Sequence, residues 1–270
     1  MASATTAPWQ RPQNSHWNAT CRWQSSPAAA EPQHVSVFPN NEAAATAYVI
    51  PKYLNDGYWW AYVNPMAIRA LDRQYLVNMV LWGHATLLQD TVFDGIGDAN
   101  GSIHGRTLQI ACVYGNFTEK LMRRMTPDAS LNVIDAVPGQ VENLKRKVDS
   151  KLENVSLSCA AAEDLEFEDD SFDQAVIFFL LHEIPNSARI QALKEAARVL
   201  KPGGKLVLVD FHRPKSMWHK IWMTANFIAY EPYAKDLWYH EIVDWLPENM
   251  SAHKELLCDG VYQKVVATKH

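Results

Sequence analysis

The chain has few cysteines, and they form no pattern that would build a covalent framework. The four, at positions 21, 112, 159 and 258, are far apart and include no CxxC pair. Neither a zinc site nor a set of disulfides is therefore predicted. The sequence also lacks an apolar run of about 18 residues, the length that a membrane-spanning helix needs. We therefore predict no membrane-spanning helix.

Positive charge is also in short supply. Lys and Arg number 25 against 30 Asp and Glu, which gives a net charge of -5. No block of basic residues alternates with aromatic ones, so no nucleic-acid partner is predicted. Tryptophan, by contrast, is abundant, with ten residues, and five of them lie in or beside apolar helical stretches: Trp59, Trp60, Trp82, Trp218 and Trp222. Such helices favour peripheral contact with a membrane, and ordinary core packing is the alternative.

Composition divides the chain into a tail, a cap and a larger domain. Residues 1–45 are rich in Ala, Ser, Thr, Pro and Gln, contain Arg11 and Arg22, and have no acidic residue before Glu31. This bias is typical of a mitochondrial transit peptide, and a disordered tail is the alternative. If the tail is a transit peptide, we expect a mitochondrial location, on the matrix side of the inner membrane. Residues 46–104 predict a helical cap that includes one helix over 65–93.

Residues 105–270 alternate between apolar strands and helices. Strands are predicted at 108–113, 131–137, 155–159, 172–181 and 205–210, and helices at 117–125, 139–148 and 187–200, the last capped by Ser187. This alternation predicts an α/β domain with a mostly parallel sheet covered on both faces. An aromatic helical insertion over 214–250 follows. A β-hairpin, 255–258 and 261–268 joined by Asp259-Gly260, closes the chain.

Polar side chains follow three of the predicted strands, at the sheet edge where open parallel sheets bind ligands. Asp135 ends the second strand, where a carboxylate can accept both hydroxyls of a ribose; a turn-capping role is the alternative. His182 and Glu183 follow the fourth strand and are candidate catalytic residues, with a structural role as the alternative. Asp210 and His212 follow the fifth. Alternate residues of an extended segment point to one side, so these two could bind one metal ion, or form a hydrogen-bonded loop pair.

Three motifs resemble the class I S-adenosylmethionine (SAM)-dependent methyltransferases: the loop after the first strand, ACVYGN (111–116), the segments AEDLEF (162–167) and SFD (171–173), and RVLKPGGKL (198–206). The resemblance implies a Rossmann-like sheet that binds SAM through Ala111, Val113, Gly115, Asp135 and Ala162. The family's first loop is an acidic residue followed by Gly-x-Gly-x-Gly. Here Gln109 replaces the acid, and Ala111 and Val113 replace two glycines. Because glycine lets the backbone approach a ligand closely, these side chains should narrow the methionine end of the pocket.

A narrower resemblance rests on five segments: YWWAYVNP (58–65), ACVYGNFT (111–118), FFLLHEIP (178–185), LVDFHRP (208–214) and LWYHEIVDWLP (237–247). Together they resemble the rhodoquinone biosynthesis protein family over about residues 48–250. The family implies conversion of ubiquinone to rhodoquinone, in which an amino group replaces a ring methoxy group. SAM is implied as the nitrogen donor, with a divalent metal, manganese, assisting.

On this reading the catalytic candidates are His182, Glu183 and Tyr114, and the metal candidates are Asp210 and His212. The insertion and the helix over 65–93 would cover a long isoprenoid tail. Two other readings remain open. One is a conventional SAM-dependent methyltransferase of a quinone or lipid. The other is a non-catalytic SAM-binding accessory protein.

Overall fold

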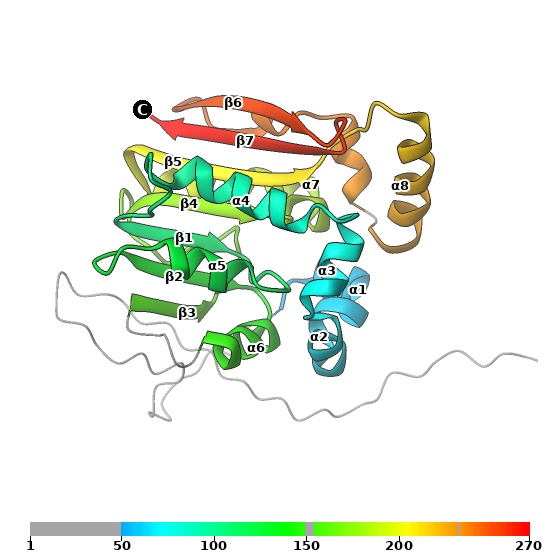
Figure 1. Ribbon diagram of the computed structural model, residues 1–270, viewed down its shortest axis with the longest axis horizontal. Coiled ribbons are helices and arrows are strands. Elements are labelled where there is room, and N and C mark those ends of the chain that lie inside the picture. Colours follow the sequence, from blue (N-terminus) through cyan, green and yellow to red (C-terminus); the bar gives the residue numbers. More distant parts are fainter. Residues whose placement is uncertain (1–49, 149–153, 232) are drawn as a thin grey trace, which may run out of the picture.

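A single seven-stranded sheet forms the centre of the molecule (Figure 1). The computed structural model describes residues 50–148, 154–231 and 233–270, so the predicted tail over 1–45 lies outside the described residues. The strands follow the order β3-β2-β1-β4-β5-β7-β6. Their bounds are Arg106–Ile110 for β1, Ser130–Asp135 for β2, Val155–Cys159 for β3, Phe172–Phe178 for β4, Leu200–Phe211 for β5, Met250–Leu257 for β6 and Tyr262–Lys269 for β7.

Strands β1 to β5 are parallel, and β7 runs antiparallel between β5 and β6. The predicted α/β sheet and the closing hairpin are therefore confirmed. The turn of the hairpin places Cys258, Asp259 and Gly260 in the left-handed backbone region. The Asp259-Gly260 pair that the sequence pointed to suits that conformation better than most residues, because Gly and Asp adopt it at low cost.

Helices cover both faces of the sheet because the central strands are apolar on both sides. Val176 and Phe178 of β4 pack in one core cluster, with α4 (Ala85–Ile96), α5 (Phe117–Arg124) and α6 (Pro138–Val148). Ala175 and Ile177, which alternate with them, pack in the other, with α7 (Asn186–Val199). Successive side chains of this strand thus point to opposite faces of the sheet and pack in two different cores.

The expected single helix over 65–93 is broken twice. The structure has α2 (Pro65–Leu71), α3 (Gln74–Val80) and α4, preceded by α1 (Lys52–Gly57) and a π-helix, η1 (Trp59–Val63). The first break follows Asp72, whose carboxylate bonds to the loop after β1. The second lies at Trp82 and Gly83, which have φ values of 50° and 84°. The helical periodicity was right, but α4 packs on the sheet rather than with the cap.

Two predictions at the ends of α7 were also inexact. The helix begins at Asn186, directly after Pro185, and no side chain caps it, so the capping role predicted for Ser187 is wrong. At the other end, β5 begins at Leu200, and the Lys-Pro-Gly-Gly segment lies inside it. Gly203 has a φ of 80°, and the pairing with β4 shifts register between Phe172 and Gln174. The segment is therefore an irregular start of the strand.

The aromatic insertion folds into α8 (Met217–Tyr230) and two 3-10 helices, η4 (Ala234–Trp238) and η5 (Ile242–Trp245). Fully buried Arg189 of α7 ties it to the sheet. The guanidinium donates to the carbonyls of Leu181 and Tyr233, both at 2.6 Å, and pairs with Asp236 at 3.2 Å. As Figure 1 shows, α8 and the cap helices α1 to α3 lie beyond the same end of the sheet. No helix in the described ranges is long and apolar enough to cross a bilayer.

Candidate active site

A cavity of about 760 Å³ lies between the sheet, the cap and α8. Its size suits a small molecule or cofactor, for which pockets of roughly 300–1,000 Å³ are usual. The loops after β1, β2, β3 and β4 and the last residue of β5 contribute to its wall, which is the edge where parallel sheets bind ligands. Its apolar lining includes Trp60, Met79, Trp82, Val113, Phe179, Phe211, Trp222 and Tyr262.

The loop after β1 keeps a glycine-like backbone without a glycine at its first position. Ala111 has a φ of 75°, which costs a residue with a β-carbon about 1–2 kcal/mol. Gln109 supports this turn, because its amide donates to the Ala111 carbonyl at 3.0 Å and its carbonyl accepts from the Thr118 hydroxyl at 3.0 Å. Ala111 and Val113 both line the cavity. At Ala111 the loop therefore has a backbone conformation typical of glycine, but the side chains of Ala111 and Val113 face the cavity.

Tyr114 is held firmly in the cavity wall. Its hydroxyl donates to the Ala61 carbonyl at 2.7 Å and accepts from the Gln140 amide at 2.8 Å. Its ring stacks on Tyr62 of the cap, with centroids 5.6 Å apart. Burial raises the pKa of Tyr114 above its usual value. These contacts hold Tyr114 in the cavity wall with its proton engaged, and its catalytic role stays a prediction.

Gly115, a predicted cofactor residue, does not line the cavity. Its N–H donates to Asp72 of the cap at 2.7 Å, and a β-carbon at this position would lie 2.5 Å from the Gln74 side-chain oxygen. Asp72 also accepts from Asn143 at 2.6 Å and from Lys147 at 2.9 Å, and Lys147 in turn donates to the Gly115 carbonyl. Gly115 therefore fastens the loop to the cap.

Asp135 stands at the end of β2 with its carboxylate partly engaged. One oxygen accepts the N–H of Cys112 at 2.7 Å and the other accepts that of Val137 at 2.8 Å. The Cys112 side chain also bonds to the carboxylate, which leaves one of its roughly four acceptor positions for a hydroxyl from the cavity. Burial raises the pKa of Asp135 to about 7, against the opposing effect of the two N–H donors. This geometry is compatible with the predicted contact to a ribose.

The wall beside Asp135 carries a second carboxylate. Ala162 lines the cavity here, as does the next residue, Glu163. One oxygen of Glu163 accepts the Tyr53 hydroxyl at 2.8 Å. The other is buried and has no hydrogen-bond partner in the described part of the chain. Glu163 therefore offers an acceptor next to Ala162, one of the predicted SAM contacts.

The predicted catalytic pair, His182 and Glu183, belongs to a buried charge cluster in the wall of the same cavity. The Nδ1 of His182 lies 2.9 Å from Asp210, and its backbone N–H donates to the same carboxylate at 3.3 Å. Its Nε2 lies 3.6 Å from Glu183 and 3.9 Å from Glu231. Both glutamates and the imidazole line the cavity, and Asp210 lies behind them.

The cluster has perturbed proton affinities. Burial by itself would lower the pKa of His182, but the charge and hydrogen bond of Asp210, with Glu231 and Glu183, raise it to about 9. Burial raises the pKa of Glu183 well above its usual value, and Glu231 adds to the rise while His182 opposes it. Burial also raises the pKa of Glu231. One imidazolium thus faces two carboxylates whose pKa values burial raises, which makes both glutamates easier to protonate than exposed ones.

The proposed metal pair is not brought together. Asp210 bonds to His182, whereas the His212 ring lies 3.1 Å from the Gly260 carbonyl, 3.3 Å from Lys254 and 4.0 Å from Glu241. The alternation that predicted a shared side fails because β5 ends at Phe211. Within the described ranges, no group of three or more His, Cys, Asp or Glu side chains is arranged to hold a metal ion. These residues do not fit the predicted site.

Sequence reasoning missed Glu231, which comes from the end of the insertion. One signal was available: Glu231 is the single acidic residue between positions 211 and 235, in an otherwise aromatic and basic segment. It also missed Asp72 and Gln140, which fix the loop after β1. Their neighbours along the chain give no hint of this role, because their partners are far away in sequence.

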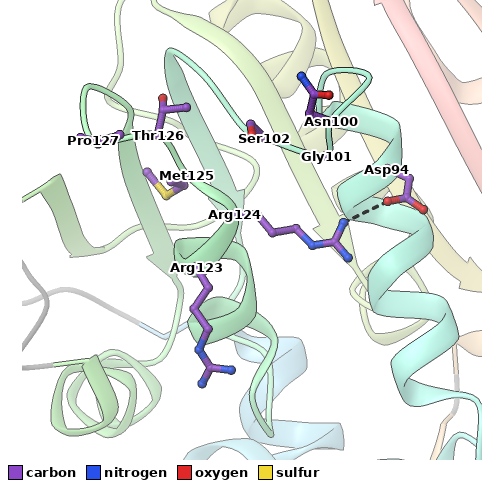
Figure 2. Close-up of a pocket in the computed structure, with 9 residues that line it drawn as sticks. All are labelled: Asp94, Asn100, Gly101, Ser102, Arg123, Arg124, Met125, Thr126 and Pro127. Carbon is purple, nitrogen blue, oxygen red and sulfur yellow. Dashed lines mark hydrogen bonds and ion pairs between the residues drawn. The ribbon is translucent and has the colours of Figure 1, made fainter.

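A second hollow, of about 710 Å³, is lined by residues 94, 100–102 and 123–127. In Figure 2, Arg124 reaches Asp94, and Arg123 points away from Asp94 and Asn100. Arg124 pairs with both Asp94 and Asp90 at 2.9 Å, so its charge is already balanced. Because the charge of Arg124 is already paired, this hollow is a weaker candidate for a binding site than the cavity beside His182.

In comparison with known proteins, residues 107–204 match the family described as a methyltransferase domain. A ubiquinone/menaquinone biosynthesis C-methyltransferase of Geotalea daltonii is 36% identical over 114 residues, 42% of this chain and 48% of that protein. A demethylmenaquinone methyltransferase of Staphylococcus aureus is 33% identical over 139 residues, 52% of this chain and 55% of that protein. The chain spans about half the length of the curated relatives it matches.

Solved structures agree on the fold. A SAM-dependent methyltransferase of Thermotoga maritima, described as a possible histamine N-methyltransferase, superposes with a TM-score of 0.55 at 19% identity, covering 76% of this chain and 97% of that one. The N-methyltransferase NodS of Bradyrhizobium japonicum, in complex with S-adenosyl-L-homocysteine (SAH), gives 0.51 at 18% identity, with 76% and 93% covered. The fold is that of the SAM-dependent methyltransferases.

Proposed function

We propose that this chain, whose residues 107–204 match a methyltransferase domain family, uses SAM to replace a methoxy group of ubiquinone by an amino group, which yields rhodoquinone in its reduced, quinol form. The observation that carries the proposal is the loop after β1. Val113 and the immobilised Tyr114 line the cavity there, where a glycine-rich loop would leave bare backbone. A pocket rebuilt at the methyl-donor end supports a reaction in which another group of SAM is transferred.

Two groups of polar side chains in the cavity wall support a division of labour. Asp135 has an acceptor position left for a ribose hydroxyl of SAM, and Ala162 also lines the cavity. His182, Glu183 and Glu231 form the second group. We assign Asp135 to the nucleoside and the second group to the amino group and the quinone ring. The apolar lining between them suits the ring and the start of an isoprenoid tail.

The proposed reaction balances without an external oxidant. The unprotonated amino nitrogen of SAM forms a C–N bond to the methoxy-bearing ring carbon, and the methoxy group leaves as methanol with a proton from that nitrogen. The bond between nitrogen and the methionyl α-carbon must then break. Loss of the α-proton sends two electrons into the ring, which becomes a quinol. Water replaces the nitrogen at the α-carbon and leaves it as a ketone, so the amino group remains on the quinol.

The charge cluster supplies the proton transfers that these steps need. Deprotonation of the SAM ammonium requires a base, and Glu183 and Glu231 have pKa values raised toward neutrality by burial. A ring carbonyl that gains electrons requires a proton, and His182 holds one, with Asp210 fixing its ring through Nδ1. Since the described residues form no metal group, we derive no step through manganese.

Methyl transfer to a quinone is the second candidate. It is favoured by the two relatives described above, which are 36% and 33% identical and are named as methyltransferases of the ubiquinone and menaquinone pathways. The same cavity and the same proton-accepting cluster would serve a C-methylation, in which the ring carbon loses a proton as it gains the methyl group.

One experiment separates the candidates. The purified chain is incubated with a short-tailed ubiquinone and SAM labelled either at its amino nitrogen or at its methyl carbon, and the quinone is analysed by mass spectrometry. Amination lowers the quinone mass and carries the nitrogen label into the product. A heavier product with the methyl label would replace our proposal by methylation. Retained SAM binding without any product would indicate an accessory protein.

A loop variant links the product to the observation that carries the proposal. Val113→Gly restores bare backbone and should lower the amination rate, whereas Val113→Ile keeps the wall filled and should retain most of it. If Val113→Gly aminates as fast as the unmodified chain, the loop is not the reason for the reaction.

A further inference from the structure

The tryptophans at the cap end of the molecule are exposed instead of packed. Large apolar side chains of the cap are between 38% and 65% exposed at Trp59, Trp60, Tyr75, Met79, Val80 and Trp82. On α8, side chains are between 52% and 68% exposed at Met217, Trp218, Ile221 and Trp222. The core-packing alternative for the five tryptophans is therefore wrong. We call these ten side chains the aromatic face.

The two parts of the aromatic face are continuous. The indole of Trp82 stacks on the His219 ring of α8, with centroids 5.2 Å apart and planes 23° from parallel. Along α8, Trp218 and Trp222 contact each other edge to face at 6.3 Å. The cap and α8 thus present one surface beyond the same end of the sheet (Figure 1).

This surface also leads into the cavity. Trp60, Met79, Val80, Trp82 and Trp222 belong to the aromatic face and line the cavity as well. If an apolar phase covers the aromatic face, a molecule that leaves this phase can reach the charge cluster along apolar side chains. Monomeric proteins rarely expose large apolar patches without a binding function.

The charges around the face have one sign. Residues 57–84 contain two cations, Arg69 and Arg73, both exposed, and one acid, Asp72, whose side chain is only 6% exposed. Residues 212–225 contain Arg213, Lys215 and Lys220 and no acid at all. The whole chain is acidic, with a net charge of -5. A basic rim on an acidic protein indicates that the face meets a negatively charged surface.

We propose that the aromatic face docks on a lipid bilayer that carries anionic headgroups. Exposed tryptophans and a flanking set of Lys and Arg are the two features that hold a protein at such an interface. The α8 helix and the cap then lie among the headgroups, and the cavity opens toward the acyl chains. The docking does not depend on the proposed function, which only says what enters the cavity from the bilayer.

The test is co-sedimentation of the full chain with vesicles of phosphatidylcholine, with or without phosphatidylglycerol. We expect binding to the anionic vesicles that weakens with salt. Arg213→Gln with Lys215→Gln should weaken it about 25-fold, at about fivefold per charge. The matched control is Arg123→Gln with Lys205→Gln, two exposed residues away from the face. It changes the net charge equally and should leave binding unchanged.

An apolar variant tests the other half of the proposal. Trp218→Ser with Ile221→Ser removes two exposed side chains that do not line the cavity, and should weaken vesicle binding by at least about tenfold. The thermal unfolding midpoint of each variant confirms that it is folded.

Three results would overturn the proposal. The chain fails to bind anionic vesicles; the face and control variants bind alike; or the aromatic face instead joins two copies of the chain, so that the serine variant turns a dimer into a monomer without changing vesicle binding. Because the assay contains neither SAM nor quinone, its failure is distinct from a failure of the amination. That failure would appear as vesicle binding without an aminated product.

Discussion

The sharpest prediction concerns Asp135→Asn. In the native protein each carboxylate oxygen of Asp135 accepts one backbone N–H, from Cys112 at 2.7 Å or from Val137 at 2.8 Å. An asparagine keeps one oxygen and places an amide donor where the other oxygen was. One buried N–H therefore loses its acceptor, which costs about 1–3 kcal/mol of folding free energy.

The effect on ligand binding is larger if the ribose sits where we propose. The substitution removes the negative charge and weakens the acceptor position that the carboxylate leaves for a ribose hydroxyl. Hydrogen bonds to charged groups contribute about 1.5–3 kcal/mol, so SAH should bind about 10- to 150-fold more weakly. Since burial raises the pKa of Asp135 to about 7, the affinity of the unmodified chain should also fall as the pH drops through that value.

Calorimetric titration with SAH measures the affinity, and thermal unfolding measures the stability. Asp173→Asn is the matched control, because Asp173 also accepts a backbone N–H, from Arg106 at 2.7 Å, and a Lys201 ammonium at 2.6 Å. It does not line the cavity, so its variant should lose stability and keep SAH affinity. The reasoning is refuted if Asp135→Asn is destabilised but binds SAH as tightly as the unmodified chain.

Two further predictions concern the charge cluster and its support. The pKa of His182 rises on folding to about 9. Its contribution to the free energy of unfolding, about 3 kcal/mol, is therefore complete below about pH 6.5 and is lost as the pH rises through 9. The unfolding midpoint should fall over that pH range, and it should fall less in the His182→Gln variant. Arg189→Met removes the donor to the Leu181 carbonyl and one of the two donors to the Tyr233 carbonyl, which also accepts from the Asp236 N–H at 3.2 Å; it should cost about 1–3 kcal/mol in denaturant unfolding, whereas exposed Arg123→Met should change it by less than about 0.5 kcal/mol.

The sheet could be predicted from the sequence because its signals are local. Strand β4 and the second half of β5 are apolar runs, and the final hairpin has Asp259-Gly260 at its turn. The breaks within residues 65–93 could not, because one depends on a bond from Asp72 to Gly115, 43 positions away. Periodicity reports which residues face a core, and carries no information on where a distant backbone group interrupts the helix.

The candidate site was predicted in the same uneven way. Strand ends placed His182, Glu183 and Asp210 at one edge of the sheet, and the structure brings them together. Which of them pair was not accessible, since Asp210 turns to His182 instead of His212. Glu231 arrives from the insertion, and its position depends on packing such as that of Arg189 against the Tyr233 carbonyl.

Asp72 makes the cap and the loop after β1 a single mechanical unit, because one carboxylate accepts from Gly115 of the loop, from Asn143 and from Lys147. If binding of a nucleoside stabilises that loop, the same coupling free energy also makes displacement of the cap less favourable. We therefore expect ordered binding, in which the nucleoside binds first and holds the cap over the cavity, and the second ligand enters past the aromatic face.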